Sequence, residues 1–252
     1  MQRDKVREEI ESFQELWKGG TNPSKWGWDR PVERMLVGGV DIEAIYEICI
    51  KPYAVPGTRV LDIGTNGGIW LSKMTLADDL IGFDVLSAEH VGFWQNMLSW
   101  LSPGEIEKVG FVQVTDFSCS TLEDSSIDLV FSYDVFCHIS YSGAAAYLQN
   151  LFSKLRPGAN GFIMIADDDK IPRDAKGQRR REKCMFKSGF IAWKDFIKDD
   201  DGAVSRTPGR WYFYGTDKFC ALLEKYGYEV LSRDVAEKAA EISPIIHFRK
   251  PQ

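Results

Sequence analysis

The chain has 252 residues, a formal net charge of −6 and a hydrophobic content of 44%. This composition is typical of a soluble globular protein with one large domain, or with a core domain and additions. No run approaches the roughly 20 apolar residues that a membrane-spanning helix needs, and the charged N-terminus is unlike a secretory signal. The acidic balance argues against a general affinity for nucleic acid, which requires clustered Lys and Arg. We therefore expect no integral membrane segment and no nucleic-acid partner.

The cysteines are scattered and include no CxxC pair, so they predict neither a zinc site nor a disulfide framework. This pattern favours a reducing, cytoplasmic compartment. The cysteines are Cys49, Cys119, Cys137, Cys184 and Cys220.

The first 57 residues are predicted to form a helical addition that acts as a lid. An amphipathic helix is expected to end at Gly19-Gly20, and a second helix is expected at 41–50. The apolar face of the first helix carries Val6, Ile10, Phe13 and Leu16.

From residue 58 onward, short β-rich runs alternate with helical stretches. The predicted strands are 59–63, 80–85, 109–115, 127–133 and 161–167, and the clearest helices are 88–101 and 142–155. Such alternation indicates βαβ units, a mostly parallel sheet and helices on both of its faces.

The C-terminal part has a different pattern. A helix at 216–227, ending on Gly227, precedes two strands at 228–233 and 244–249 with no helix between them. These two strands are expected to pair antiparallel at one edge of the sheet. The core domain is therefore predicted to span 58–252, with a charged and aromatic insertion at 168–215 on the substrate side.

A glycine-rich turn, DIGTNGG, follows the first core strand at 62–68. It is a poor match to the dinucleotide fingerprint GxGxxG, because Asn66 and Ile69 stand where the second and third glycines should be. The turn instead resembles the D/E-x-G-x-G-x-G motif of class I S-adenosylmethionine-dependent methyltransferases. Asp62 and Gly68 fit that motif, whereas Asn66 replaces its middle glycine.

Further landmarks of the same family follow in order. Asp84 ends the second strand, 20 residues after Gly64 (84 − 64 = 20), where the family has an acid for the ribose hydroxyls. Asp116 matches the acid that faces the adenine amino group, with Phe117 beside it. The sequence LRPGA at 155–159 is similar to the family's turn before the fifth strand.

This resemblance implies a Rossmann-like three-layer sandwich whose seven-stranded sheet has the order 3-2-1-4-5-7-6, with strand 7 antiparallel. It implies S-adenosylmethionine as cofactor, with the glycines making room for its methionine and ribose parts. The implied cofactor-binding residues are Asp62, Gly64, Thr65, Asn66, Gly68, Asp84, Asp116, Phe117 and Tyr133.

Candidate catalytic residues follow the fourth and fifth strands. His138 stands where many small-molecule methyltransferases carry a histidine beside the methyl-transfer site. It is either a general base or a histidine that packs the cofactor or holds the loop by hydrogen bonds. Asp167 and Asp168 could orient His138, act as the base, bind a divalent cation alone or with Asp134, or form a solvated loop end. No metal ligand set is predicted from this pattern.

The acceptor is expected to be a small polar, sugar or glycan-like molecule, methylated on oxygen. The motifs of DNA methyltransferases are missing after the fourth strand, and the aromatic and basic insertion suits sugars or ring-bearing substrates. Three alternatives remain: N-methylation of an amino sugar or metabolite, a non-catalytic cofactor-binding protein of the same fold, and a nicotinamide-dependent oxidoreductase. A homo-oligomer is compatible with the sequence.

Overall fold

The computed structural model describes residues 2–16, 36–37, 40–167, 170, 212–235 and 243–252. The predicted insertion at 168–215 therefore lies almost wholly outside the described residues, as does Asp168. Leu16 is described only as part of a helix backbone.

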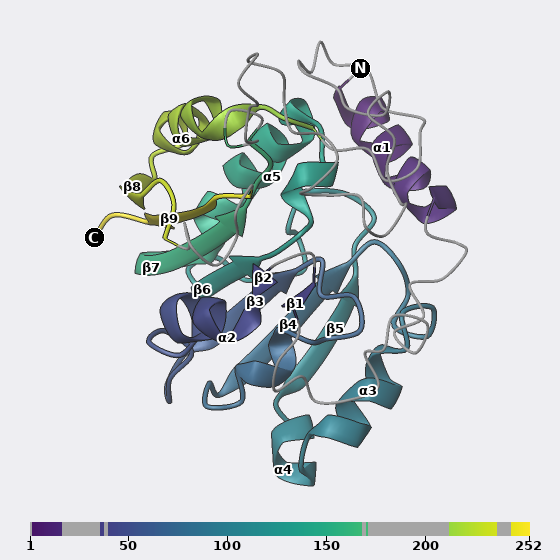
Figure 1. Cartoon of the computed structure of the whole chain (residues 1–252). Coiled ribbons are helices and arrows are strands. Elements are labelled where there is room, and N and C mark those ends of the chain that lie inside the picture. Colours follow the sequence, from purple (N-terminus) through teal and green to yellow (C-terminus); the bar gives the residue numbers. More distant parts are fainter. Residues whose placement is uncertain (1, 17–35, 38–39, 168–169, 171–211, 236–242) are drawn as a thin grey trace.

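A seven-stranded sheet forms the centre of the molecule, with the strand order β5-β4-β3-β6-β7-β9-β8 (Figure 1). Numbered along the core domain, this order is 3-2-1-4-5-7-6. Adjacent strands from β5 to β7 pair parallel, whereas β9 is antiparallel to both of its neighbours. The predicted fold and strand order are confirmed. The strands are β3 (Arg59–Ile63), β4 (Asp79–Asp84), β5 (Val109–Gln113), β6 (Ile127–Ser132), β7 (Leu155–Met164), β8 (Glu229–Ser232) and β9 (Ile245–Arg249).

Helices cover both faces of this sheet, which makes three layers (Figure 1). Successive residues of a strand point to opposite faces, so Leu61 and Ile81 join one apolar cluster while Val60 and Leu80 join the other. The first cluster includes residues of α1 (Gln2–Leu16), α5 (Tyr141–Lys154) and α6 (Gly215–Lys225). The second includes residues of α2 (Ile42–Ile45), η2 (Tyr46–Ile50), η3 (Leu71–Lys73) and α3 (Phe93–Trp100).

The N-terminal segment packs on this core at two places. Ile10 of α1 is buried, with Val6 and Phe13 partly buried beside it, as the amphipathic pattern predicted. The second predicted helix is observed as α2 followed by the π-helix η2, and its Ile45 and Cys49 are fully buried. Between these parts, β1 (Leu36–Val37) and β2 (Val40–Asp41) form a separate two-stranded sheet.

Several element boundaries differ from those predicted. The short 3-10 helix η3, which follows the glycine turn, was not among the predicted helices. Helix α3 begins only after Gly92, which has a left-handed backbone, and the short helix α4 (Pro103–Ile106) was not predicted. Strand β7 begins at Leu155 because that residue already pairs with Ile127 across an irregular register.

Among the described residues, no helix is both long and apolar enough to cross a membrane. The described cysteines, which are Cys49, Cys119, Cys137 and Cys220, are all buried free thiols.

Candidate active site

The glycine turn is held against the end of β4 by backbone hydrogen bonds. The amides of Gly64 and Thr65 both donate to the carbonyl of Phe83, at 2.7 and 2.9 Å. Three residues of the turn have positive φ angles, which are +74° at Gly64, +48° at Asn66 and +85° at Gly68. Asn tolerates this conformation better than most residues, so Asn66 can replace the family's second glycine.

The turn glycines make room for protein side chains, not only for a ligand. A Cβ atom built on Gly64 would lie 2.1 Å from a methyl of Val135, and one built on Gly68 would lie 2.2 Å from the Met97 terminal methyl. That the turn also makes room for the cofactor stays a prediction, because these contacts concern protein side chains alone. At these positions glycine is required by close packing and by the positive φ angle.

Two buried polar atoms of the turn lack a hydrogen bond in the described part of the chain: Asp62 Oδ2 and Thr65 Oγ1. The residues are only 1% and 4% exposed. Burial raises the pKa of the Asp62 carboxyl to about 7; the neighbouring Thr65 side chain opposes that rise, and the nearby Asp84 charge adds to it. An unsatisfied buried carboxylate is costly, so this site suits a ligand that brings a positively charged donor.

Asp84, at the end of β4, is also buried but differs from Asp62 in its partners. Its Oδ2 accepts from the amide of Asn66 at 2.8 Å and its Oδ1 from the amide of Leu86 at 2.9 Å. Burial raises the pKa of this carboxyl, and the two backbone donors oppose that rise. Asp84 thus holds the glycine turn in place, while each oxygen keeps a second lone pair for a ligand hydroxyl.

The remaining predicted cofactor residues lie at neighbouring strand ends. Asp116 is exposed, and its Oδ1 caps the amide of Ser118 at 2.8 Å. The Phe117 ring is 3% exposed and stacks on Tyr147, with 5.1 Å between ring centroids. The Tyr133 ring is half-buried and lies 5.3 Å from that of Trp70. The roles of these residues toward adenine and methionine remain predictions.

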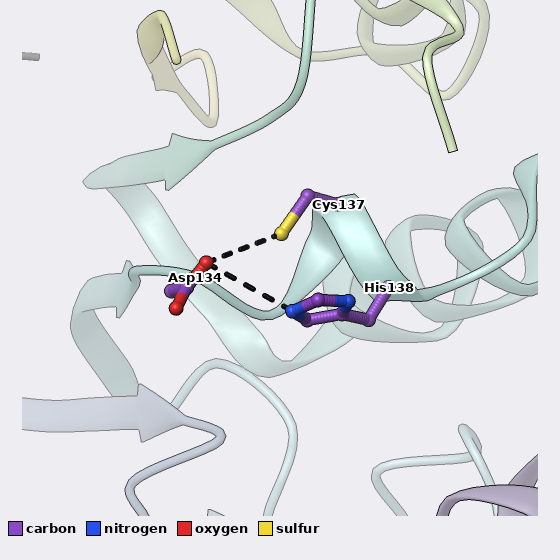
Figure 2. Close-up of side chains that lie close together, drawn as sticks. All are labelled: Asp134, Cys137 and His138. Atoms are coloured by element: carbon purple, nitrogen blue, oxygen red, sulfur yellow. Dashed lines mark hydrogen bonds and ion pairs between the residues drawn. The ribbon is translucent and has the colours of Figure 1, made fainter. Parts of the chain in front are cut away.

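His138 lies in the short 3-10 helix η4 (Phe136–His138), just after β6. Its Nε2 is 3.9 Å from Oδ1 of Asp134, which is too long for a hydrogen bond but close enough for a charge interaction. The same Oδ1 accepts a hydrogen bond from the Cys137 thiol at 3.5 Å (Figure 2). The His138 side chain is 12% exposed and that of Asp134 is 55% exposed.

The acid that follows β7 is bonded to the start of helix α6. Asp167 is 8% exposed, and its Oδ2 accepts from the amide of Thr216 at 3.0 Å and from the Thr216 hydroxyl. Asp167 therefore caps the N-terminus of α6, a structural task that its sequence position did not reveal. The carboxylate beside His138 is instead that of Asp134, from the same loop. Asp168 lies outside the described residues.

Sequence reasoning missed a contact between the N-terminal helix and this region. Glu9 of α1 is 4% exposed, and its carboxylate accepts from the amide and the hydroxyl of Ser140, the N-cap of α5. Gln14 donates to the carbonyl of Val85, next to Asp84, at 2.9 Å. Charged residues of an amphipathic helix are ordinarily expected on its exposed face. Only the tertiary structure could show that Glu9 is buried against Ser140.

A family model described as a methyltransferase domain matches residues 42–233. The chain belongs to this methyltransferase family. It is a class I S-adenosylmethionine-dependent methyltransferase, and its cofactor is S-adenosylmethionine. No match was found among curated proteins.

Solved structures of low sequence identity share this methyltransferase's fold. One is a SAM dependent methyltransferase from Aquifex aeolicus, with 18% identity, a TM-score of 0.56, and coverage of 91% of this chain and 98% of that chain. Another is phosphoethanolamine N-methyltransferase 1 of Haemonchus contortus, with 13% identity, a TM-score of 0.64, and coverage of 100% of this chain and 50% of that chain. A third is the [4+2]-cyclase SpnF, with 13% identity, a TM-score of 0.56, and coverage of 83% of this chain and 80% of that chain.

The residues at the glycine turn of this methyltransferase fit its cofactor. The open Oδ2 of Asp62 and the hydroxyl of Thr65 can pair with an amino group, and Asp84 can accept from ribose hydroxyls. The residues that follow β6 then lie beside the turn, because Val135 packs against Gly64. The carboxyl ends of β3, β4 and β6 thus bring the glycine turn, Asp84 and the loop that carries His138 to the same edge of the sheet, where ligands of this class of sheet bind.

Proposed function

We propose that this methyltransferase methylates a hydroxyl oxygen of a small polar acceptor of sugar or glycan type, with His138 as the general base. The observation that carries the proposal is the pairing of His138 Nε2 with the Asp134 carboxylate at 3.9 Å, next to the glycine turn. A hydroxyl, unlike a neutral amine, must lose its proton during the transfer.

The roles of the chain's own residues follow from this geometry. The bound cofactor supplies an electrophilic methyl group on its sulfonium. His138 would take the hydroxyl proton on Nε2 and become an imidazolium as the acceptor oxygen gains the methyl group, and the cofactor would leave as S-adenosylhomocysteine. The Asp134 carboxylate stabilises that imidazolium by charge attraction. Because Asp134 is 55% exposed, the attraction stays near the value in water, about 1 kcal/mol at 4 Å.

Helix α1 is proposed to act as the lid. Through Glu9 it contacts Ser140, two residues after His138, and through Gln14 it contacts Val85, one residue after Asp84. The helix therefore spans the two loops that flank the predicted site, and Figure 1 shows it beside α5. A cover in this position excludes water and positions an acceptor.

The test is methyl transfer to matched acceptors. We expect transfer from S-adenosylmethionine to a panel of sugars, detected by mass spectrometry, with hydroxyl sugars preferred to the amino sugars of the same ring. Preference for the amino sugars, with turnover that survives loss of His138, would instead favour N-methylation. Cofactor binding without transfer to any acceptor would favour a non-catalytic protein, or a different reaction on the same fold, which the [4+2]-cyclase SpnF exemplifies.

A further inference from the structure

Three side chains that commonly bind metal ions converge after β6. Asp134, Cys137 and His138 each offer one ligand atom, and these atoms all lie within 4.8 Å of one another. Figure 2 shows the thiol and the imidazole pointing toward the same carboxylate oxygen. The D-x-x-C-H spacing brings them together because Cys137 and His138 lie in the 3-10 helix η4, which follows Asp134 within one turn.

The cluster is close in size to a tetrahedral zinc site, with all three ligand atoms within 4.8 Å of one another. Zinc bonds of about 2.3 Å to sulfur and about 2.0–2.1 Å to nitrogen or oxygen place adjacent ligand atoms about 3.3–3.6 Å apart. The Cys137 Sγ to Asp134 Oδ1 separation is 3.5 Å, within this range. The His138 Nε2 to Asp134 Oδ1 separation is 3.9 Å, slightly longer. Asp134 is half-exposed, so a small rotation of its side chain would close that difference.

The backbone holds the three residues in position. The amide of Tyr212 donates to the Cys137 carbonyl at 2.7 Å, and the amide of His138 donates to the Val135 carbonyl at 2.8 Å. The Tyr214 hydroxyl donates to the carbonyl of Phe136. Asp134 has a φ angle of +60°, which is uncommon for a residue with a side chain. The cluster therefore sits on a fixed loop.

We propose that Asp134, Cys137 and His138 form a binding site for a zinc ion, with an open fourth position. A thiolate and an imidazole select zinc over magnesium or calcium, which prefer oxygen ligands. One carboxylate and one thiolate balance the two charges of the ion. The site differs from the cation site that the sequence suggested around Asp167, because Asp167 is bonded to Thr216.

Binding would displace the Cys137 proton to solvent as the Zn–S bond forms, because the thiolate is the ligand. The metal would also take the Nε2 lone pair of His138 that a general base uses. The zinc-loaded and base-competent forms of His138 are thus different states of the protein. Zinc binding itself does not depend on the proposed methyl transfer, and the experiment measures it without cofactor or acceptor.

The test uses the purified full chain, freed of metal by a chelator and kept reduced. Titration with Co²⁺ should produce one equivalent of a tetrahedral ligand-field spectrum with a thiolate-to-metal charge-transfer band, and Zn²⁺ should displace it. Cys137→Ala should remove the charge-transfer band and weaken zinc binding by at least about tenfold. Cys49→Ala is the matched control, because both cysteines are fully buried, and it should bind like the wild type.

Asp134→Asn is a second variant that should keep the fold, because Asn tolerates the positive φ angle at this position. It should weaken zinc binding at least about tenfold while the thermal melting curve stays close to that of the wild type. No charge-transfer band in the wild type, a band that survives in Cys137→Ala, or equal zinc affinity in all the variants would overturn the proposal.

Discussion

The ends of β3 and β4 differ from the end of β6 in how they hold their acidic residues. Asp62 and Asp84 are buried, and Asp84 is fixed by the backbone amides of Asn66, in the glycine turn, and of Leu86. Asp134 is 55% exposed, and its carboxylate contacts the side chains of Cys137 and His138. The first region suits selective binding, because buried polar atoms discriminate strongly between partners. The second suits proton or metal chemistry, which requires groups that can exchange with solvent or substrate.

The largest expected effect concerns the reactive region. If His138 is the general base, His138→Ala should lower kcat by roughly 10²–10⁴-fold and leave S-adenosylhomocysteine affinity nearly unchanged. The acidic limb of the pH–rate profile should also disappear, because the variant has no base that protonation can inactivate. Steady-state kinetics across pH and titration calorimetry provide the two measurements.

His138→Gln separates this role from a packing role, because Gln keeps a polar side chain of similar reach. If His138 is the general base, the His138→Gln variant should have a kcat as low as that of His138→Ala. Recovery of turnover in the Gln variant would show that His138 only packs the loop, and the distinction between the two regions would then fail.

Asp62→Asn tests the cost of the buried carboxyl in the binding region. The pKa of Asp62 is about 7 in the fold against an ordinary 3.8, so the wild type loses stability as pH rises from about 4 to about 7 and changes little above that. The Asn variant lacks this loss. We expect its stability relative to the wild type, without cofactor, to rise by about 4 kcal/mol over that interval, measured by urea unfolding.

The same substitution should weaken S-adenosylhomocysteine binding at pH 8 by about 1–3 kcal/mol, because a charged acceptor is lost. In the wild type, affinity should rise with pH through about 7, since protonated Asp62 cannot pair with an ammonium group. An affinity that is flat across this range would place the amino group of the cofactor elsewhere.

Asp84→Ala should weaken S-adenosylhomocysteine binding by roughly 1–3 kcal/mol and lower the melting temperature, because the amides of Asn66 and Leu86 lose their acceptor. Calorimetry and thermal melting measure the two effects. Asp79→Ala, at the other end of β4 and paired with Arg59, is the matched control. This partly exposed ion pair lies away from the predicted site, so the control should bind S-adenosylhomocysteine normally.

Glu9→Gln tests the helix that joins the two regions. Loss of the carboxylate at the N-terminus of α5 should weaken the docking of α1 by about 1–2 kcal/mol. Hydrogen exchange of α1 amides should therefore quicken, with acceptor turnover reduced more than cofactor affinity. Glu11→Gln, on the exposed face of the same helix and paired with Arg7, should change neither measurement. If Glu9→Gln and Glu11→Gln changed hydrogen exchange and turnover equally, the proposal that α1 acts as a lid would be contradicted.

The smallest effect is expected at Asp167. Asp167→Ala removes the cap of α6 and should cost about 1 kcal/mol of stability, measured by urea unfolding, with little change in kcat. A drop in kcat comparable to that of His138→Ala would return Asp167 to the catalytic role that its sequence position predicted.

Much of the fold could be predicted from local patterns. The apolar runs at 59–63 and 127–133 and the helix at 142–155 coincide closely with β3, β6 and α5. The glycine turn and the acid 20 residues later identified the cofactor class. These features are local in the chain, because periodicity and turn chemistry act over a few residues.

The sequence by itself determined the fold class, the strand order through family resemblance, and the cofactor. Only the tertiary structure decided which carboxylate lies beside His138, why Gly64 and Gly68 lack side chains, and where Glu9 is buried. Each of these depends on contacts between segments or on the turn of one short helix. The sequence gives the chemical type of each side chain. Its hydrogen-bond or charge partner and its exposure to water depend on which distant groups the folded sheet brings to the same edge.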